Sequence, residues 1–241
     1  MPNNLIIIAV VAYLIGSIPF GYILVKLFLN QDIRQTGSGN IGATNVARSG
    51  KKGLAIATLL LDAGKGALAV LWAGYRFSDL AGNWYPQTAS RFLAHDFVLE
   101  GGPLPDLTFL ALATLFAVIG HCFPVWLKFK GGKGVATAIG AFVVLSPKAA
   151  LAAMLCFGLV FVITRYVSLA SILSALAFPA LILWMGPRSR TPSLLLFCAT
   201  VSVLIILKHH ANIRRLIAGT EPKFGRKPIG TTDPIQTEKS I

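Results

Sequence analysis

The sequence predicts an all-α, polytopic integral membrane protein with seven transmembrane helices. The chain has 241 residues, of which 55% are hydrophobic, and its mean hydropathy is +0.70. Only 13% of the residues are charged, about half the ~25% typical of a soluble domain. Long apolar stretches also recur along the chain, and a helix needs about 20 such residues to cross a bilayer. These observations exclude a soluble globular domain, a disordered chain and a disulfide scaffold.

The apolar stretches give the seven helices in order. No basic residue precedes the first stretch and no cleavage motif follows it, so we expect a span rather than a cleaved signal peptide. The stretch from 135 to 164 exceeds one crossing by about ten residues. Ser146-Pro147-Lys148 interrupts it with a helix breaker and a charge, which predicts two short helices joined by a tight turn. The expected spans are 5–29, 54–75, 107–127, 135–145, 149–164, 167–185 and 193–207.

The charges between these spans predict the orientation. Segments 30–53 and 128–134 and the chain from Lys208 onward are basic, whereas segment 76–106 is net acidic. Seven spans place the three basic segments on one side, which the positive-inside rule identifies as cytoplasmic. We therefore expect a periplasmic N-terminus and a cytoplasmic C-terminus, although Arg188 and Arg190 then lie on the outer side.

The chain is expected to form a single membrane domain over residues 1–225, followed by a polar cytoplasmic tail at 226–241. Its net charge of +13, from 22 Lys and Arg against 9 Asp and Glu, suits anionic headgroups or phosphorylated substrates. The three cysteines all lie in apolar stretches, so they are interpreted as small buried hydrophobic residues rather than disulfides or metal ligands. These are Cys122, Cys156 and Cys198.

The first basic segment contains a run of glycine and small polar residues from Gly37 to Arg48. Its glycines match the G-x-G-x-x-G dinucleotide pattern, but a membrane helix precedes them instead of a strand, so we reject that interpretation. Glycines let backbone N–H groups converge on an anion, and Arg48 can clamp a phosphate. An ordinary polar turn is the alternative. The expected substrate-binding residues here are Gly37, Gly39, Asn40, Gly42, Thr44 and Asn45, with Ser38 and Arg48 beside them.

The second basic segment, Lys130 to Gly134, leads directly into the helix expected at Val135. It lacks the spacing of a Walker A loop. Free backbone N–H groups at a helix N-terminus, together with lysines, still favour a phosphate or carboxylate site. The alternative is a cytoplasmic loop whose glycines only form a turn. The candidate residues are Lys130, Lys133, Gly131, Gly132, Gly134 and Thr137.

A third motif follows the last span and contains His209 and Asn212, which share a face if the helix continues. The histidine is a candidate general base or phosphate ligand, and a basic interfacial helix end is the alternative. Asp62 and Lys65, inside the second span, are either a structural pair or a support for the anion site. No carboxylate occurs between Asp106 and Glu221, which argues against paired-carboxylate hydrolysis and a carboxylate metal cage in that stretch.

Together these motifs closely resemble the bacterial acyl-phosphate:glycerol-3-phosphate acyltransferase family (PlsY). The resemblance implies a seven-helix enzyme of the bacterial inner membrane, with its active site facing the cytoplasm. It also implies acyl transfer from acyl phosphate to the 1-hydroxyl of sn-glycerol 3-phosphate. The products are lysophosphatidic acid and phosphate, in the first committed step of phospholipid synthesis. The motifs, within about residues 6–223, are Gly37–Arg48, Gly120–Pro124, Phe129–Thr137 and Gly219–Glu221.

The resemblance also implies roles for individual residues, with no cofactor and no metal. Expected partners are acyl phosphate, glycerol 3-phosphate, membrane lipids and, transiently, the soluble enzyme that makes acyl phosphate; nucleic acid is not expected. Segment 76–106 is longer than is usual in the family, and His210-Ala211 stands where an Arg-Glu pair is common. The implied catalytic residues are Ser38, Arg48, Lys130, Lys133, His209 and Asn212, and Glu221 joins the substrate-binding residues named above.

Two other functions fit the composition. An organic-anion or phosphate transporter would place its site near the membrane midplane, often between inverted repeats. In this sequence the polar motifs gather at one face and no repeat is evident. A non-catalytic anionic-lipid-binding protein would explain the charge, but not the density of Ser, Asn, Thr and Gly in the motifs.

Overall fold

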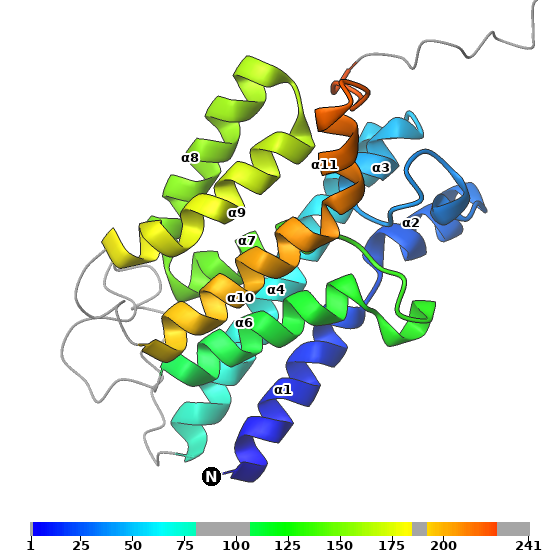
Figure 1. Cartoon of the computed structure of the whole chain (residues 1–241). Helices are drawn as coiled ribbons and strands as arrows, with labels where there is room; N and C mark the ends of the chain where they lie inside the picture. The colour runs from blue at the N-terminus through cyan, green and yellow to red at the C-terminus, as the bar shows by residue number, and fades with distance from the viewer. Residues whose placement is uncertain (1, 81–106, 185–191, 226–241) are drawn as a thin grey trace, which may run out of the picture.

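The computed structural model describes residues 2–80, 107–184 and 192–225, and within them all regular secondary structure is helical (Figure 1). Four parts of the sequence predictions lie outside the described residues. They are the last residue of the expected span 167–185, positions 81–106 of the acidic segment, Arg188 with Arg190, and the tail 226–241. The helices are α1 (Pro2–Ser17), α2 (Phe20–Leu29), η1 (Ile33–Gln35), α3 (Ala43–Arg48), α4 (Lys52–Leu80), α6 (Leu107–Cys122), η2 (Val125–Leu127), α7 (Val135–Leu145), α8 (Pro147–Thr164), α9 (Val167–Trp184), α10 (Pro192–Lys208) and α11 (His210–Ile217).

Each expected span is helical over most of its length. The first differs from the prediction, because α1 ends at Ser17 and α2 begins at Phe20 instead of one helix running through. Pro19 lacks a backbone N–H and disfavours helical geometry in the residue before it, which accounts for the break. The predicted break near Ser146 is confirmed, since α7 ends at Leu145 and α8 begins at Pro147.

Five stretches of the described chain are long and apolar enough to cross a membrane, and the first of them includes the break at Pro19. A sixth is obtained when α10 and α11, which bend by 57° at their junction, are counted together. Helix α7 is apolar but has only 11 residues. The fold is therefore that of a multi-span helical membrane protein.

The long helices lie side by side, and the short elements gather at one end (Figure 1). Helix α1 packs against α6, α4 packs against α6 and α7, and α9 packs against both α8 and α10. The short helices α3 and α11 lie at the end of the molecule away from the N-terminus. This arrangement brings the three polar motifs of the sequence to the same end.

Small residues allow the helices to approach closely, as is typical of membrane proteins. A Cβ atom on Gly16 of α1 would clash with the backbone of Ala117 on α6. A Cβ atom on Gly66 of α4 would clash with the carbonyl of Thr137 on α7. These contacts fix α1 against α6 and α4 against α7, the two helix pairs that position the second polar loop.

Large apolar side chains also cover the outside of the molecule. On α8, Leu155, Leu159 and Val162 are between 65% and 72% exposed. An exposed apolar surface of this kind marks contact with another apolar phase. Since α8 is long enough to span a bilayer, lipid is the phase that this surface suits.

Candidate active site at one end of the helices

The loop between α2 and α3 is organised by the side chain of Asn45. Its Nδ2 donates to the carbonyl oxygens of Ile33, Thr36 and Asn40 at 3.1, 3.0 and 2.8 Å. Its Oδ1 accepts from the backbone N–H of Ser38 at 2.8 Å. Asn45 is buried, so it shapes the loop from within instead of facing a ligand.

The tip of this loop needs glycine. Gly37 and Gly39 adopt φ angles of 57° and 69°, which L side chains rarely adopt. A Cβ atom on Gly37 would also clash with Asn45 Oδ1. Ser38 therefore lies exposed at the tip of a tightly constrained turn.

The sequence predicts that backbone N–H groups of this loop point at an anion, but three of them are already hydrogen-bonded within the loop. Ser38 N–H is bonded to Asn45, Gly39 N–H donates to Thr36 O at 3.0 Å, and Gly42 N–H donates to Asn40 Oδ1 at 2.8 Å. These donors already have partners inside the loop. An anion at this loop would therefore be held mainly by side chains, with Arg48 as the strongest candidate.

Arg48 ends α3 and lies in the electrostatic field of residues from the third motif. Partial burial lowers the pKa of Arg48, the charge of Glu221 opposes that shift, and the charge of Arg215 adds to it. Its Cδ lies 3.7 Å from the position of a Cβ on Gly37. The first and third motifs are therefore close enough for their charges to interact.

The second loop packs tightly against the end of α6. Gly132 N–H donates to His121 O at 2.9 Å, and a Cβ atom on Gly132 would clash with the imidazole of His121. Gly134 adopts a φ of 82° and directly precedes α7. The glycines therefore have a packing role, which places Lys133 at the N-terminus of α7.

A buried charged cluster supports this loop from beneath. Lys65 Nζ lies 2.8 Å from Asp62 Oδ1 and donates to Ile18 O at 2.6 Å. His121 Nδ1 lies 3.6 Å from the same carboxylate oxygen. The cluster connects the break between α1 and α2 with α4 and α6, at the point where His121 contacts Gly132. This geometry favours the interpretation that Asp62 and Lys65 support the predicted anion site from beneath, through His121.

The second and third motifs are joined by a chain of short hydrogen bonds. Lys133 Nζ donates to Asn212 Oδ1 at 2.6 Å, and Asn212 Nδ2 donates to Glu221 Oε1 at 2.7 Å. Ser168 Oγ donates to the same carboxylate oxygen at 2.8 Å, and Arg215 Nε donates to Glu221 Oε2 at 2.7 Å. The Glu221 side chain is only 4% exposed. We call Lys133, Asn212, Glu221, Ser168 and Arg215 the Lys133 network.

The pKa values in the Lys133 network are shifted for identifiable reasons. Burial lowers the pKa of Lys133 to about 8, against the opposing charge of Glu221. Burial acts to raise the pKa of Glu221, but hydrogen bonds from Asn212, Ser168 and Arg215 outweigh it and hold the pKa below its usual value. At neutral pH the network therefore contains an ionised carboxylate and a lysine that is close to titrating.

His209 lies beside the network at the junction of α10 and α11. Its Nδ1 is 2.7 Å from the carbonyl oxygen of Ile205. A carbonyl only accepts, so Nδ1 carries the proton and, in the neutral ring, Nε2 has a free lone pair. The side chain is buried and within electrostatic range of Lys133 and Glu221.

The structure therefore brings together part of the predicted site. Lys133, Asn212, Glu221, His209 and Arg48 converge from three motifs. Lys130 is exposed on the second loop, and Thr137 is fully buried in α7, behind the loop. The remaining predicted residues of the first loop are Gly37, Ser38, Gly39, Asn40, Gly42, Thr44 and Asn45, of which Asn45 and the glycines have the structural roles described above.

Sequence reasoning missed two members of the Lys133 network. Ser168 stands at the start of α9, between apolar residues, and nothing in the sequence around it indicates a polar role. Arg215 lies within the basic chain from Lys208 onward, six residues before Glu221 and with a glycine-containing turn between them. That spacing was the available signal.

The fold and the site define a multi-span helical membrane protein with a cationic, hydrogen-bonded site at one end of its helices. A family model described as glycerol-3-phosphate acyltransferase matches residues 6–219. The chain belongs to this family of membrane enzymes.

Relatives match over nearly the whole chain. The glycerol-3-phosphate acyltransferase of Nitrobacter winogradskyi is 45% identical over 226 residues, covering 94% of this chain and 98% of that protein. The corresponding protein of Syntrophotalea carbinolica is 44% identical over 218 residues, covering 90% and 96%. The sequence resemblance to the PlsY family is thereby confirmed.

Two solved structures of PlsY, an integral membrane glycerol 3-phosphate acyltransferase, share the fold. The glycerol 3-phosphate form has a TM-score of 0.74 at 34% identity and covers 92% of this chain and 96% of that chain. The lysophosphatidic acid form has a TM-score of 0.72 at 33% identity, covering 92% and 95%.

Proposed function

We propose that the protein transfers an acyl group from acyl phosphate to the 1-hydroxyl of sn-glycerol 3-phosphate, giving lysophosphatidic acid and phosphate, at the end of the helices where Arg48 meets the Lys133 network. The observation that carries this proposal is the 2.6 Å hydrogen bond from Lys133 to Asn212. This bond joins the glycine-rich loop to the third motif. The charges of Glu221 and Arg215 in the third motif also act on Arg48 of the first motif. Both substrates carry a phosphate group, and a site with several fixed cations can hold them together.

Each cation has a defined task in this proposal. Arg48 clamps one phosphate through its planar guanidinium group. Lys133, held by Asn212, faces the phosphate of the second substrate and stabilises the charge that develops as it leaves. Lys130 and the exposed hydroxyl of Ser38 extend the site at its rim. Glu221 fixes Asn212 and Arg215, so it positions the cations without touching the substrates.

The reaction needs no covalent enzyme intermediate, because acyl phosphate is already activated. The 1-hydroxyl oxygen forms a bond to the acyl carbon, the bond from that carbon to the bridging phosphate oxygen breaks, and phosphate leaves with the electron pair. The hydroxyl proton passes to His209 Nε2 or to a phosphate oxygen of the substrate itself. The protonated Nδ1 of His209 leaves a lone pair on Nε2. Burial and the charge of Lys133 lower the pKa of His209 to about 4, which favours the phosphate oxygen as the proton acceptor.

The topology is part of the proposal. We infer a single domain over residues 1–225 with seven spans and a polar tail at 226–241. We also infer a periplasmic N-terminus, a cytoplasmic C-terminus and a location in the bacterial inner membrane. The gathering of α3, the second loop and α11 at one end supports a site that faces the cytoplasm, since all three regions are basic. Labelling of single cysteines placed at Lys51 and Lys227 in intact cells tests this: labelling of either by an impermeant reagent contradicts the orientation.

The partners follow from the reaction. Acyl phosphate and glycerol 3-phosphate are the substrates, and membrane lipids surround the helices. A soluble enzyme that makes acyl phosphate would have to deliver an apolar product to this membrane face, so transient contact with it is expected. Neither a metal nor an organic cofactor has a step in this reaction.

The experiment compares acyl donors with purified protein in lipid or detergent micelles. Palmitoyl phosphate and palmitoyl-CoA are supplied in parallel, each with and without glycerol 3-phosphate, and lysophosphatidic acid is measured. We expect product only with palmitoyl phosphate. Product only with the CoA ester would keep the acyltransferase and overturn the donor. A folded protein that is silent with both donors would overturn the proposal.

A further inference from the structure

The end of α6 is a junction to which three other elements are tied. The last carbonyl oxygens of a helix have no partner within the helix itself. The carbonyl of His121 accepts from an N–H of the second loop at 2.9 Å, and the carbonyl of Phe123 accepts from the hydroxyl of Tyr13 at 2.8 Å. Between them, the carbonyl of Cys122 accepts from Lys208 Nζ at 3.2 Å. The second loop, α1 and α10 therefore all meet at this helix end.

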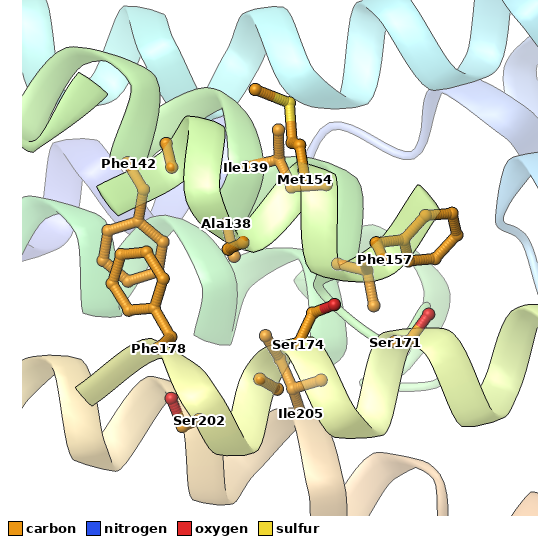
Figure 2. Close-up of a pocket in the computed structure, with 14 residues that line it drawn as sticks. Ala138, Ile139, Phe142, Met154, Phe157, Ser171, Ser174, Phe178, Ser202 and Ile205 are labelled. Carbon is orange, nitrogen blue, oxygen red and sulfur yellow. The ribbon is translucent and has the colours of Figure 1, made fainter. Parts of the chain in front are cut away.

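Lys208 is the last residue of α10, and its side chain is directed into the molecule. Ile205, three positions earlier, lines a pocket between α7, α8, α9 and α10 (Figure 2), and residues three apart share a helix face. Lys208 Nζ also lies 4.6 Å from the centre of the Phe123 ring, a distance typical of a cation–π contact. The residues at the end of α6 therefore hold this ammonium group at two points.

Two residues of the proposed active site depend on this contact. His209 directly follows Lys208, where α10 and α11 meet at an angle of 57°. Lys133 lies in the second loop, which is bonded to the neighbouring carbonyl at the end of α6. The bond from Lys208 to the Cys122 carbonyl therefore joins the segment that carries His209 to the segment that carries Lys133.

Lys208 also contributes to the electrostatics of the site. Burial is the main cause of the lowered pKa of Lys133, and the charge of Glu221 opposes it. Positive charges from three different helices add to the effect of burial, and Lys208 is one of them. The charged and titratable groups that act on Lys133, or that its charge acts on, are Glu221, Arg215, Arg48, Lys208 and His209.

We propose that Lys208 is a positioning residue for the acyl transfer, which holds His209 and the second loop in a fixed relation on the end of α6. The inference rests on the proposed acyl transfer at the Lys133 network. The ammonium group acts through His209 and Lys133, without touching the substrates. A cation suits this place, because the C-terminal end of a helix carries partial negative charge. A displacement of reacting groups by about 1 Å can cost ~100-fold in rate.

The test uses three substitutions of Lys208 that separate its hydrogen bond from its charge. Lys208→Met removes both, Lys208→Gln keeps a donor without the charge, and Lys208→Arg keeps both. Lys52→Met is the matched control, because Lys52 begins α4 with an exposed side chain and its removal changes the net charge equally. For each folded protein, kcat and kcat/KM for glycerol 3-phosphate are measured from pH 7 to pH 9 with palmitoyl phosphate as donor.

We expect Lys208→Met to lower kcat at pH 7 by roughly tenfold. Its alkaline decline in kcat/KM should move to higher pH, because loss of a neighbouring positive charge raises the pKa of Lys133. Lys208→Gln should show the same movement with a smaller loss of kcat. Lys208→Arg should restore both properties, and the Lys52→Met control should match the wild type in both.

The outcomes separate positioning from a general role in folding. A wild-type kcat in Lys208→Met would overturn the proposal, and so would a loss of kcat with an unmoved alkaline decline. A control that changes as much as Lys208→Met would also overturn it. If Lys208→Met does not fold, Lys208→Gln decides, and a wild-type pH profile in that variant overturns the proposal. A wild-type protein inactive with palmitoyl phosphate and glycerol 3-phosphate would instead overturn the proposed function.

Discussion

The titration of Lys133 gives the sharpest quantitative prediction. Burial brings the pKa of Lys133 to about 8, from an ordinary value of 10.5. In the proposed mechanism only the ammonium form stabilises the departing phosphate. Activity is therefore complete below the pKa of Lys133 and is lost as the pH rises through it. The acid side of the profile belongs to other groups, such as the substrate phosphates.

The size of the effect follows from the pKa itself. With a pKa of about 8, roughly nine tenths of the lysines are protonated at pH 7 and roughly one tenth at pH 9. We therefore expect kcat/KM to fall about tenfold between pH 7 and pH 9. A lysine with the ordinary pKa would lose only a few per cent of its charge over the same range.

The assay measures kcat/KM for glycerol 3-phosphate against pH, because this parameter reports the pKa of the free enzyme. Release of phosphate without enzyme is subtracted at each pH. Lys133→Arg is the control, since a guanidinium group stays charged throughout; if active, it should lose the alkaline decline. A wild-type profile that is flat from pH 7 to pH 9, or an unchanged decline in an active Lys133→Arg variant, would refute the reasoning.

Three further predictions concern neighbouring residues. Arg48→Ala should abolish turnover while leaving the circular dichroism melting curve unchanged, and a wild-type rate would contradict its role as phosphate clamp. Glu221→Gln removes the charge that raises the pKa of Lys133, so the alkaline decline should move to lower pH and kcat/KM at pH 7 should fall by about tenfold or more; an alkaline shift would contradict this sign. Gly132→Ala should lower both the melting temperature and activity, because its Cβ would clash with the imidazole of His121, and a fully active, equally stable variant would show that the loop does not need this packing.

The helices were predictable because hydropathy and length determine them. The apolar stretches, and the break at Ser146-Pro147, follow from the composition of short segments alone. The break at Pro19 was missed, although proline carried the signal, because the surrounding residues are apolar enough for one continuous span. Segment 81–106, residues 185–191 and the tail 226–241 lie outside the described residues, so the predictions for them stay predictions.

The site was predictable only in its outline. Local motifs made Lys133 and Asn212 candidates, because glycines, basic residues and polar residues stand out in an apolar chain, and Glu221 was added by the family resemblance. Their pairing depends on how the α7 N-terminus meets α11, which is a tertiary property. The same holds for Ser168, which reaches Glu221 across 53 positions of sequence. Asn45 differs in the opposite way. The sequence predicts that it binds substrate, whereas in the structure it is buried and bonded to the backbone of the loop.

The most direct test of the account is the coupling between phosphate release and product formation at the Lys133 network. Purified wild-type protein and Lys133→Met are given palmitoyl phosphate and glycerol 3-phosphate, and both products are quantified over time. The account predicts one phosphate for each lysophosphatidic acid in the wild type, no release above background without glycerol 3-phosphate, and neither product with folded Lys133→Met. Phosphate release that is independent of glycerol 3-phosphate, or wild-type turnover in Lys133→Met, would contradict it.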